Sequence, residues 1–279
     1  MSGTLVLGYD VESASESTAG FMAGAADLHE KYDIPWSIYL TGHTIDAQKD
    51  NIKPFIDHPL LTVGQHTYSH LLLKSVYMQP GDGKEIHGCF PSCFVKGGSL
   101  EQCTEEIART QKIILDEFGI VCKGITGPYN YYRGLVDRPD LLQVLQDNGI
   151  TFSRCNGRDF RDCQPTPLTE QPFFYTDQGF PDILELGIQG YQDDFYWERF
   201  DDRSHGETYQ DWLYWMLEEI SKKDLIFNLC SHDHGTKTKE EFYTHKAWLE
   251  DLIKRALDLG IRFAGPEDIY QEMKKEQVA

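Results

Sequence analysis

The segment that decides the fold reads TLVLGYDVE from Thr4 to Glu12. Its apolar run, Thr4–Tyr9, is typical of a buried strand, and Ala19–Lys31 after it has the pattern of a helix. The same succession recurs along the chain, so the sequence predicts a parallel α/β architecture, as a barrel or a doubly wound sheet. We expect one domain over residues 1–279.

The other predicted elements alternate in the same way. Strands are expected at Trp36–Leu40, Leu61–Val63, Val121–Thr126, Ile150–Ser153, Ile183–Leu186, Leu225–Leu229 and Ile261–Ala264. Helices are expected at Leu100–Phe118, Pro139–Asn148, Tyr209–Lys222, Lys239–Leu259 and Pro266–Lys275. Two loop-rich stretches, Val76–Gly98 and Arg158–Pro181, are candidates for shaping a binding cleft.

Composition limits the partners. The net charge of -19 argues against nucleic acid and against anionic membranes. We find no apolar run of about eighteen residues, so no membrane span is expected. The N-terminus has no signal-peptide pattern, which favours a cytoplasmic location. A homo-oligomer is left open.

The 7 cysteines are irregularly spaced, and reduced thiols are expected. Cys89 and Cys93 lie close together beside His87, with Cys103 further on. A second metal site and a disulfide are both alternatives there. Unpaired loop thiols are favoured over either, because the paired spacing of a structural metal site is missing.

Polar residues follow several predicted strands. Asp10 and Glu12 end the first, His66 follows the third, and His232 follows the strand at Leu225–Leu229. Pro128 and Tyr129 follow the strand at Val121–Thr126. Reactive groups of parallel α/β folds lie at the carboxyl ends of the strands, so these side chains are expected to meet.

The histidine pair and the acidic pair indicate metal chemistry. His66 and His70 lie on one face if their segment is helical, so both imidazoles would point at one metal ion. A carboxylate from elsewhere would complete a three-ligand site with open positions for water and substrate. Asp10 and Glu12, two apart in a strand, face the same way. Capping or surface roles remain alternatives for all four.

His232-Asp233-His234 offers a general acid, because the ordinary pKa of histidine lies near neutrality. Spacing leaves open which of the two histidines faces the site.

The ordered set resembles the polysaccharide deacetylases of carbohydrate esterase family 4, which share the chitooligosaccharide deacetylase homology domain. The resembling segments are Gly8-Tyr9-Asp10, Ser37–Gly42, His66–His70 (a full match to His-Ser/Thr-x-x-His), Gly127-Pro128-Tyr129, Leu229–His232 and Phe263–Glu267. The resemblance implies a distorted, incomplete (β/α) barrel. It also implies a hydrolase that removes an acyl group, acetyl above all, from the amide nitrogen of a sugar.

The resemblance further implies the roles of individual residues. Glu12, His66 and His70 would hold one divalent metal, with zinc expected and cobalt, nickel, manganese or iron as alternatives. Asp10 would take a proton from water, His232 would protonate the leaving amine, and the Tyr129 backbone N–H would stabilise the oxyanion. The substrate-binding set would be Pro128, Tyr129, Arg133 and Asp159.

The chain departs from the family pattern at three places. Val11 stands where the usual motif has a second aspartate, so Glu12 is the expected ligand, as in a branch that spaces its acids one residue apart. Gly127-Pro128-Tyr129 resembles the third motif of the family, in which an arginine usually comes first; Thr126 stands in its place, and Arg133 or Arg158 is expected to supply that charge. Asp159-Phe160 resembles the fourth motif, whose acid orients the catalytic histidine, only loosely; a surface loop is the alternative.

Substrate identity is left open. Aromatic candidates for sugar stacking are Tyr131, Tyr132, Tyr196 and Trp197, with burial in the core as the competing interpretation.

One alternative function is an intracellular amide hydrolase or deformylase acting on small molecules or lipid-linked sugars, favoured by the missing export signal. Another is a non-catalytic sugar-binding or scaffold protein, favoured by the motif departures.

Overall fold

The computed structural model describes residues 3–78, 93–194, 197–198 and 203–278. Its centre is a nine-stranded sheet in the order β10-β1-β2-β3-β6-β7-β9-β8, with β11 also pairing with β1. The strands are β1 (Thr4–Val11), β2 (Trp36–Leu40), β3 (Leu61–Gln65), β6 (Gly124–Tyr132), β7 (Phe152–Arg158), β8 (Phe173–Tyr175), β9 (Phe180–Glu185), β10 (Ile226–His232) and β11 (Arg262–Phe263). All pairings are parallel except β8 with β9.

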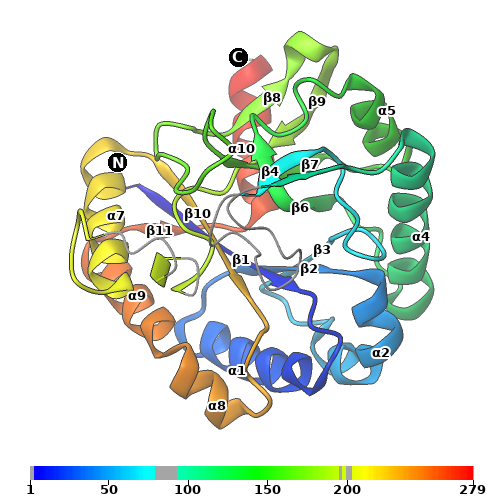
Figure 1. Ribbon diagram of the computed structural model, residues 1–279. Helices are drawn as coiled ribbons and strands as arrows, with labels where there is room; N and C mark the ends of the chain where they lie inside the picture. Colours follow the sequence, from blue (N-terminus) through cyan, green and yellow to red (C-terminus); the bar gives the residue numbers. More distant parts are fainter. Residues whose placement is uncertain (1–2, 79–92, 195–196, 199–202, 279) are drawn as a thin grey trace.

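Helices surround this sheet (Figure 1). They are α1 (Glu16–Tyr32), α2 (Gly42–Ile52), α4 (Leu100–Phe118), α5 (Pro139–Asp147), α7 (Tyr209–Lys223), α8 (Lys239–His245), α9 (Ala247–Asp258) and α10 (Pro266–Val278), with short 3-10 turns at η1 (Lys53–Phe55) and η2 (Thr176–Gln178). A separate antiparallel pair joins β4 (Val76–Met78) to β5 (Cys93–Val95). None of the described helices is both long and apolar enough to cross a membrane.

The sheet curves into an incomplete barrel. Within the described residues, no strand pairing joins β8 or β9 to β10. Residues 186–190 bridge that gap instead: the Ile188 N–H donates to Asn156 O at 2.7 Å, and the Gln189 N–H donates to Asn228 O at 3.3 Å. The predicted distorted, incomplete (β/α) barrel is therefore confirmed.

Local sequence signals account for the elements that were predicted well. β2 and α4 have the predicted limits, and α4 begins with a capping box in which Ser99 accepts from the Gln102 N–H and Gln102 reaches back. The helix α2 was not predicted because its sequence is mostly polar and lacks an apolar period. It is capped by Thr41, whose hydroxyl oxygen accepts from the Thr44 N–H.

The predicted helix Lys239–Leu259 is in fact two helices. α8 ends at His245, and Lys246 adopts φ -117° and ψ 30° between it and α9. The side chain of Lys246 is buried against Asp193 and Ser231. The apolar period alone did not predict this break, because its cause is a charge contact with a distant residue.

Candidate metal and acid–base site

Side chains from β1, β3 and β10 meet at the carboxyl ends of these strands. Asp10 is the second-last residue of β1, and its register partner in β10 is His232. His66 comes directly after β3, and its backbone N–H donates to Leu40 O at 2.9 Å. The expected convergence of these residues is therefore present in the structure.

The segment from His66 to His70 is a loop and not a helix. Thr67 has φ 59° and His70 has φ 61°, and the two imidazole centroids lie 4.7 Å apart. Left-handed backbone in a β-branched residue such as Thr67 is rare and costs about 1–3 kcal/mol. The prediction that the imidazoles lie close together assumed a helix. That assumption was wrong, but the loop brings the two rings together.

Glu12 completes a three-residue cluster with this pair. Its Oε2 lies 3.0 Å from Nε2 of His66 and 3.0 Å from Nε2 of His70. One ligand atom from each of the three residues lies within 4.8 Å of the others. His66 is oriented through Nδ1, which lies 2.9 Å from the Thr126 carbonyl oxygen and can donate to it, leaving Nε2 toward Glu12.

The electrostatics of the cluster also fit a cation. Burial raises the pKa of Glu12, but His70 and the hydrogen bonds from His234, His66 and His70 outweigh it and hold the pKa well below its ordinary value. Glu12 is therefore a carboxylate at neutral pH. One carboxylate and two imidazoles form a donor set that suits a divalent transition metal.

Of the two histidines at the end of β10, His234 is the one that lies beside Glu12. Its Nε2 lies 3.2 Å from Glu12 Oε1, and its side chain is 59% exposed. His232, by contrast, is buried on the Asp193 side. The two histidines that the sequence could not distinguish therefore serve different parts of the site.

The positive charge beside Asp10 comes from β7. Arg154 Nη1 donates to Asp10 Oδ1 and to Thr126 Oγ1, both at 3.1 Å, and the guanidinium lies 4.2 Å from the centre of the Tyr39 ring. Gly8 leaves room for it, since a Cβ there would lie 2.8 Å from Arg154 Cζ. Arg154 directly follows the predicted strand Ile150–Ser153, and that strand-end position was the signal that could have identified it.

The expectation that Arg133 or Arg158 fills this place was wrong. Arg158 donates instead to the carbonyl oxygens of Tyr129 at 2.7 Å and Asp162 at 2.8 Å, so it braces the loop after the third motif. Arg133 is exposed, and its backbone N–H donates to Asn156 Oδ1.

The carboxylate beside His232 is Asp193. Its Oδ2 lies 3.3 Å from His232 Nδ1 and 3.4 Å from the ammonium of Lys246, and it accepts from Ser231 Oγ at 3.0 Å. Burial raises the pKa of Asp193, but Lys246 and the hydrogen bonds hold it well below its ordinary value. Asp193 is therefore ionised beside His232.

The fourth-motif interpretation of Asp159 is corrected accordingly. Asp159 pairs with Arg161 at 2.7 Å and accepts from the Cys163 N–H at 3.0 Å. No sequence signal singled out Asp193, because it lies outside every predicted element.

The third-motif residues lie beside the histidine pair. The Tyr129 ring centroid is 5.3 Å from that of His70, and Tyr129 has φ 62°. Pro128 lies within β6 and is buried. Of the aromatic candidates, Tyr131 accepts from the Leu73 N–H in the core and Trp197 is buried, whereas Tyr132 is 41% exposed.

Several other predictions lie outside the described residues. Tyr196, His87 and Cys89 belong to the parts that the structure leaves undescribed, and so does the side chain of Cys93. The cysteine-cluster alternatives therefore stay predictions.

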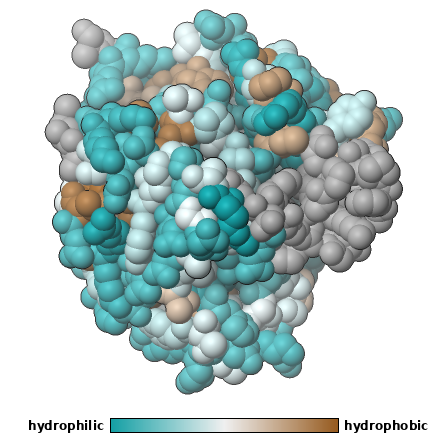
Figure 2. Space-filling view, turned by 60° about the vertical axis from the view of Figure 1, so that its left-hand side comes forward, coloured by the Kyte–Doolittle hydropathy of each residue, from teal (hydrophilic) through white to brown (hydrophobic). Residues whose placement is uncertain are grey.

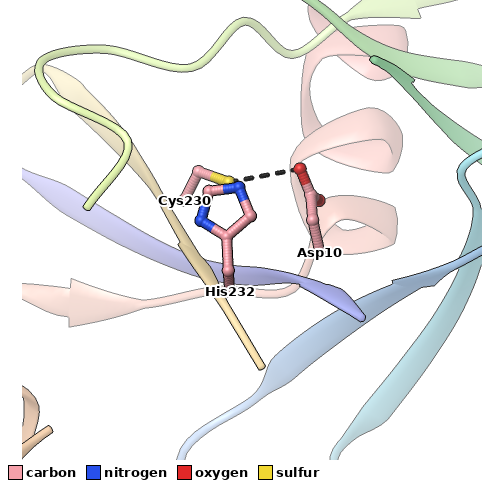
Figure 3. Close-up of side chains that lie close together, drawn as sticks. All are labelled: Asp10, Cys230 and His232. Atoms are coloured by element: carbon pink, nitrogen blue, oxygen red, sulfur yellow. Dashed lines mark hydrogen bonds between the residues drawn. The ribbon is translucent and has the colours of Figure 1, made fainter. Parts of the chain in front are cut away.

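A second cluster with metal-ligand atoms within 4.8 Å consists of Asp10, Cys230 and His232. Figure 3 shows the Cys230 thiol, which donates to Asp10 Oδ2 at 3.4 Å. Burial and the neighbouring Asp10 raise the pKa of this thiol well above its ordinary value, so it stays protonated. Arg154 contacts Asp10, so a positive charge already occupies this place. A metal ion is therefore less favoured in this cluster than between Glu12, His66 and His70.

Comparison with known proteins agrees with the fold. A family model described as polysaccharide deacetylase matches residues 3–153, which is more than half of the chain. The chain therefore belongs to the polysaccharide deacetylase family. The match ends one residue before Arg154, so it does not reach Arg154, Asp193 or His232. No match was found among curated proteins.

Solved structures extend the likeness over nearly the whole chain. A Mycobacterium smegmatis protein assigned as a polysaccharide deacetylase is 13% identical, with TM-score 0.67, over 99% of this chain and 91% of that one. An allantoinase is 11% identical, with TM-score 0.64, over 96% and 89%. A peptidoglycan N-acetylglucosamine deacetylase is 13% identical, with TM-score 0.54, over 96% and 88%. At these identities the likeness concerns the fold.

Proposed function

We propose that this protein is a metal-dependent hydrolase that removes an acyl group, acetyl above all, from an amide nitrogen of a sugar or related carbohydrate. The observation that carries the proposal is the meeting of two sets at one end of the barrel. Glu12, His66 and His70 form the ligand set. Asp10 and His232, each held by a buried charged partner, form the acid–base set.

A divalent ion held by Glu12, His66 and His70, with zinc as our first choice, would polarise the amide carbonyl and acidify a water molecule. Asp10 is the proposed base that takes the water proton, and its Oδ2 lies 3.9 Å from His66 Nε2, beside the ligand set. Arg154 fixes the orientation of Asp10 through the other oxygen.

His232 is the proposed general acid. Asp193 orients the ring through Nδ1, and we propose that the other ring nitrogen, Nε2, protonates the leaving amine. The backbone N–H of Tyr129 is proposed to stabilise the oxyanion, and Pro128, Arg133 and Asp159 stay predictions as substrate-binding residues. The cytoplasmic location and a homo-oligomer also stay predictions.

Substrate assays test this proposal. The purified protein, stripped of metal and then reloaded with Zn²⁺ or Co²⁺, would be incubated with chitooligosaccharides and with peptidoglycan fragments, and acetate release measured. We expect acetate release that depends on added metal. Full activity in a variant lacking both His66 and His70 would contradict the proposal.

A second candidate is hydrolysis of a small cyclic or formyl amide. It is favoured by the likeness to an allantoinase, which has a higher TM-score than the peptidoglycan deacetylase at similar coverage. Small cyclic and formyl amides belong in the same assay series, with ring opening or formate as the readout. Turnover of these amides without acetate release from sugars would favour this candidate.

A non-catalytic role is the third candidate, since one solved structure of similar fold, with TM-score 0.53, is a pseudoenzyme of carbohydrate esterase family 4. Two departures suggested a degenerate site, the missing arginine at Thr126 and the missing second aspartate at Val11. Arg154 lies beside Asp10 and Thr126, and Glu12 lies beside both histidines, so each departure has a nearby residue that offsets it. Metal analysis separates the cases: a protein that neither carries nor takes up metal would favour the non-catalytic role.

A further inference from the structure

Three consecutive residues at the end of β10 contact different parts of the site. His232 contacts Asp193, as described above. The Asp233 carboxylate is buried and accepts from the backbone N–H groups of Glu12 at 3.2 Å and Ser13 at 3.1 Å. It also accepts from the hydroxyls of Ser13 and Thr18, both at 2.7 Å. Asp233 therefore fixes the backbone that carries Glu12.

His234 contacts the side chain of the same residue. Its Nε2 lies 3.2 Å from Glu12 Oε1, whereas Glu12 Oε2 faces His66 and His70 at 3.0 Å each. The His234 ring is stacked on that of His232, with centroids 5.5 Å apart and planes 4° apart. The two oxygens of Glu12 therefore have separate partners, and the ring that holds Oε1 is itself held by a neighbour.

We infer that His234 is a positioning residue: it donates its Nε2–H to Glu12 Oε1 and thereby directs Oε2 to the place between His66 and His70. This inference rests on the proposed function, because it concerns the ligand set of that site. Its physical basis is the length of Glu12. A glutamate has one more rotatable bond than an aspartate, and ordering a flexible side chain costs about 0.5–1.5 kcal/mol.

A hydrogen bond to the non-ligating oxygen of a carboxylate reduces that cost before a metal binds. Partners of this kind orient metal ligands in many sites, and their removal lowers metal affinity about 10- to 100-fold. Asp233 holds the backbone of Glu12 and His234 holds its carboxylate, so the residue is fixed at both ends.

The geometry assigns His234 a place outside the ligand set. The cluster with ligand atoms within 4.8 Å of one another consists of Glu12, His66 and His70, and His234 does not belong to it. The competing assignment is a fourth ligand, which would need the imidazole ring to leave Glu12 and turn toward the ion. The two assignments predict different metal affinities for a variant in which His234 is replaced by a side chain that donates a hydrogen bond but is a poor metal ligand.

The test compares H234A and H234Q with the wild-type protein. Affinity for Zn²⁺ and for Co²⁺ is measured by competition with a chelator, and the absorption spectrum of the Co²⁺ form reports its coordination. H205A is the matched control, because His205 is an exposed histidine stacked on Trp215. We expect H234A to lose about 10- to 100-fold in affinity. H234Q, whose amide donates as the imidazole does, should recover most of it and keep the wild-type spectrum.

The outcomes separate this inference from the proposed function. Wild-type affinity in H234A would overturn the inference and leave the metal site intact. Equal loss in H234A and H234Q, with a changed Co²⁺ spectrum in both, would overturn positioning in favour of ligation. A wild-type protein that binds neither metal would overturn the proposed function, and the inference with it.

Discussion

In the part of the chain that the structure describes, two clusters of three residues bring potential metal ligands within 4.8 Å of one another, and their surroundings differ. Glu12 and His70 are partly accessible and His66 is buried, and within the described residues no lysine or arginine pairs with Glu12. Asp10, Cys230 and His232 are all buried. Two buried cations lie next to this second cluster. Arg154 pairs with Asp10, and Lys246 pairs with Asp193, the carboxylate that contacts His232.

The difference shows that local charge decides what a cluster of potential ligands can do. A buried guanidinium beside Asp10 raises the electrostatic cost of placing a dication there, because like charges repel strongly where the dielectric is low. The first cluster has a net negative ligand set and an open side, which favours a cation. The face of the molecule drawn in Figure 2 is mostly hydrophilic, with scattered hydrophobic residues.

The largest effect is expected from removing the imidazoles of the first cluster. A variant with His66→Ala and His70→Ala should bind no stoichiometric metal and should lose its activity, because one carboxylate alone holds a transition metal weakly. Metal content by elemental analysis and hydrolysis of the best substrate are the measurements. H205A should keep both. A double variant with a full metal complement would remove the distinction between the clusters.

Removing Lys246 should strongly destabilise the protein at neutral pH. Lys246→Met leaves the Asp193 charge buried with less compensation, and breaking a buried ion pair costs about 3–5 kcal/mol in the free energy of unfolding. Urea unfolding measures this loss, and Lys254→Met, which removes an exposed ion pair, should cost no more than about 1 kcal/mol.

The pH dependence of this variant follows from the lowered pKa of Asp193. In the wild type, the stability contributed by Asp193 is fully present above the ordinary carboxyl pKa and is lost as the pH falls toward the lower pKa of the folded state. Lys246→Met raises the folded pKa, since the ammonium no longer favours the carboxylate. The stability gap between variant and wild type should therefore narrow from pH 7 to pH 4. A constant gap would show that Lys246 does not act through Asp193.

A smaller effect is expected when the guanidinium beside Asp10 is removed. A hydrogen bond to a charged group contributes about 1.5–3 kcal/mol, so Arg154→Met should lower kcat about 10- to 100-fold if that energy orients the base. Metal content should stay at the wild-type level, and Arg154→Lys should recover part of the rate. Arg262→Met, at an exposed ion pair, is the control. Loss of metal with unchanged kcat per bound metal would contradict this role.

The smallest effect concerns the thiol of the second cluster. Cys230→Ala removes one hydrogen bond to Asp10, and a net contribution of about 1 kcal/mol corresponds to a change of roughly fivefold in kcat. Metal content should not change. A stoichiometric loss of metal in this variant, measured beside Cys163→Ala, would show that the buried cluster is itself a metal site.

Much of the fold could be predicted because its signals are local. The apolar run of β1, the capping box of α4 and the glycine after α5 each depend on residues close in the sequence. The break at Lys246 was missed because a contact with a distant charged residue causes it. The helix α2 was missed because its sequence is mostly polar and lacks an apolar period. The same division runs through the site.

In the site, Asp10 and His66 were singled out because they lie at strand ends, and His66 and His70 because they match a motif. Arg154 and Asp193 were missed because each is defined by what it contacts across the barrel. His234 was seen but could not be separated from His232, since the side on which each ring lies depends on how the end of β10 turns.

The contact between Asp10 and Arg154 also bears on how the protein folds. The two residues are 144 positions apart in the chain, and their strands are separated in the sheet by β2, β3 and β6. Contacts of such long range form only after the intervening chain is ordered, because closing a long loop costs entropy before any contact compensates it. Asp10 therefore acquires its charged partner only when β7 docks opposite β1. A chain that stalls before that step carries every motif residue of the N-terminal half, but Asp10, the proposed base, still lacks Arg154 beside it.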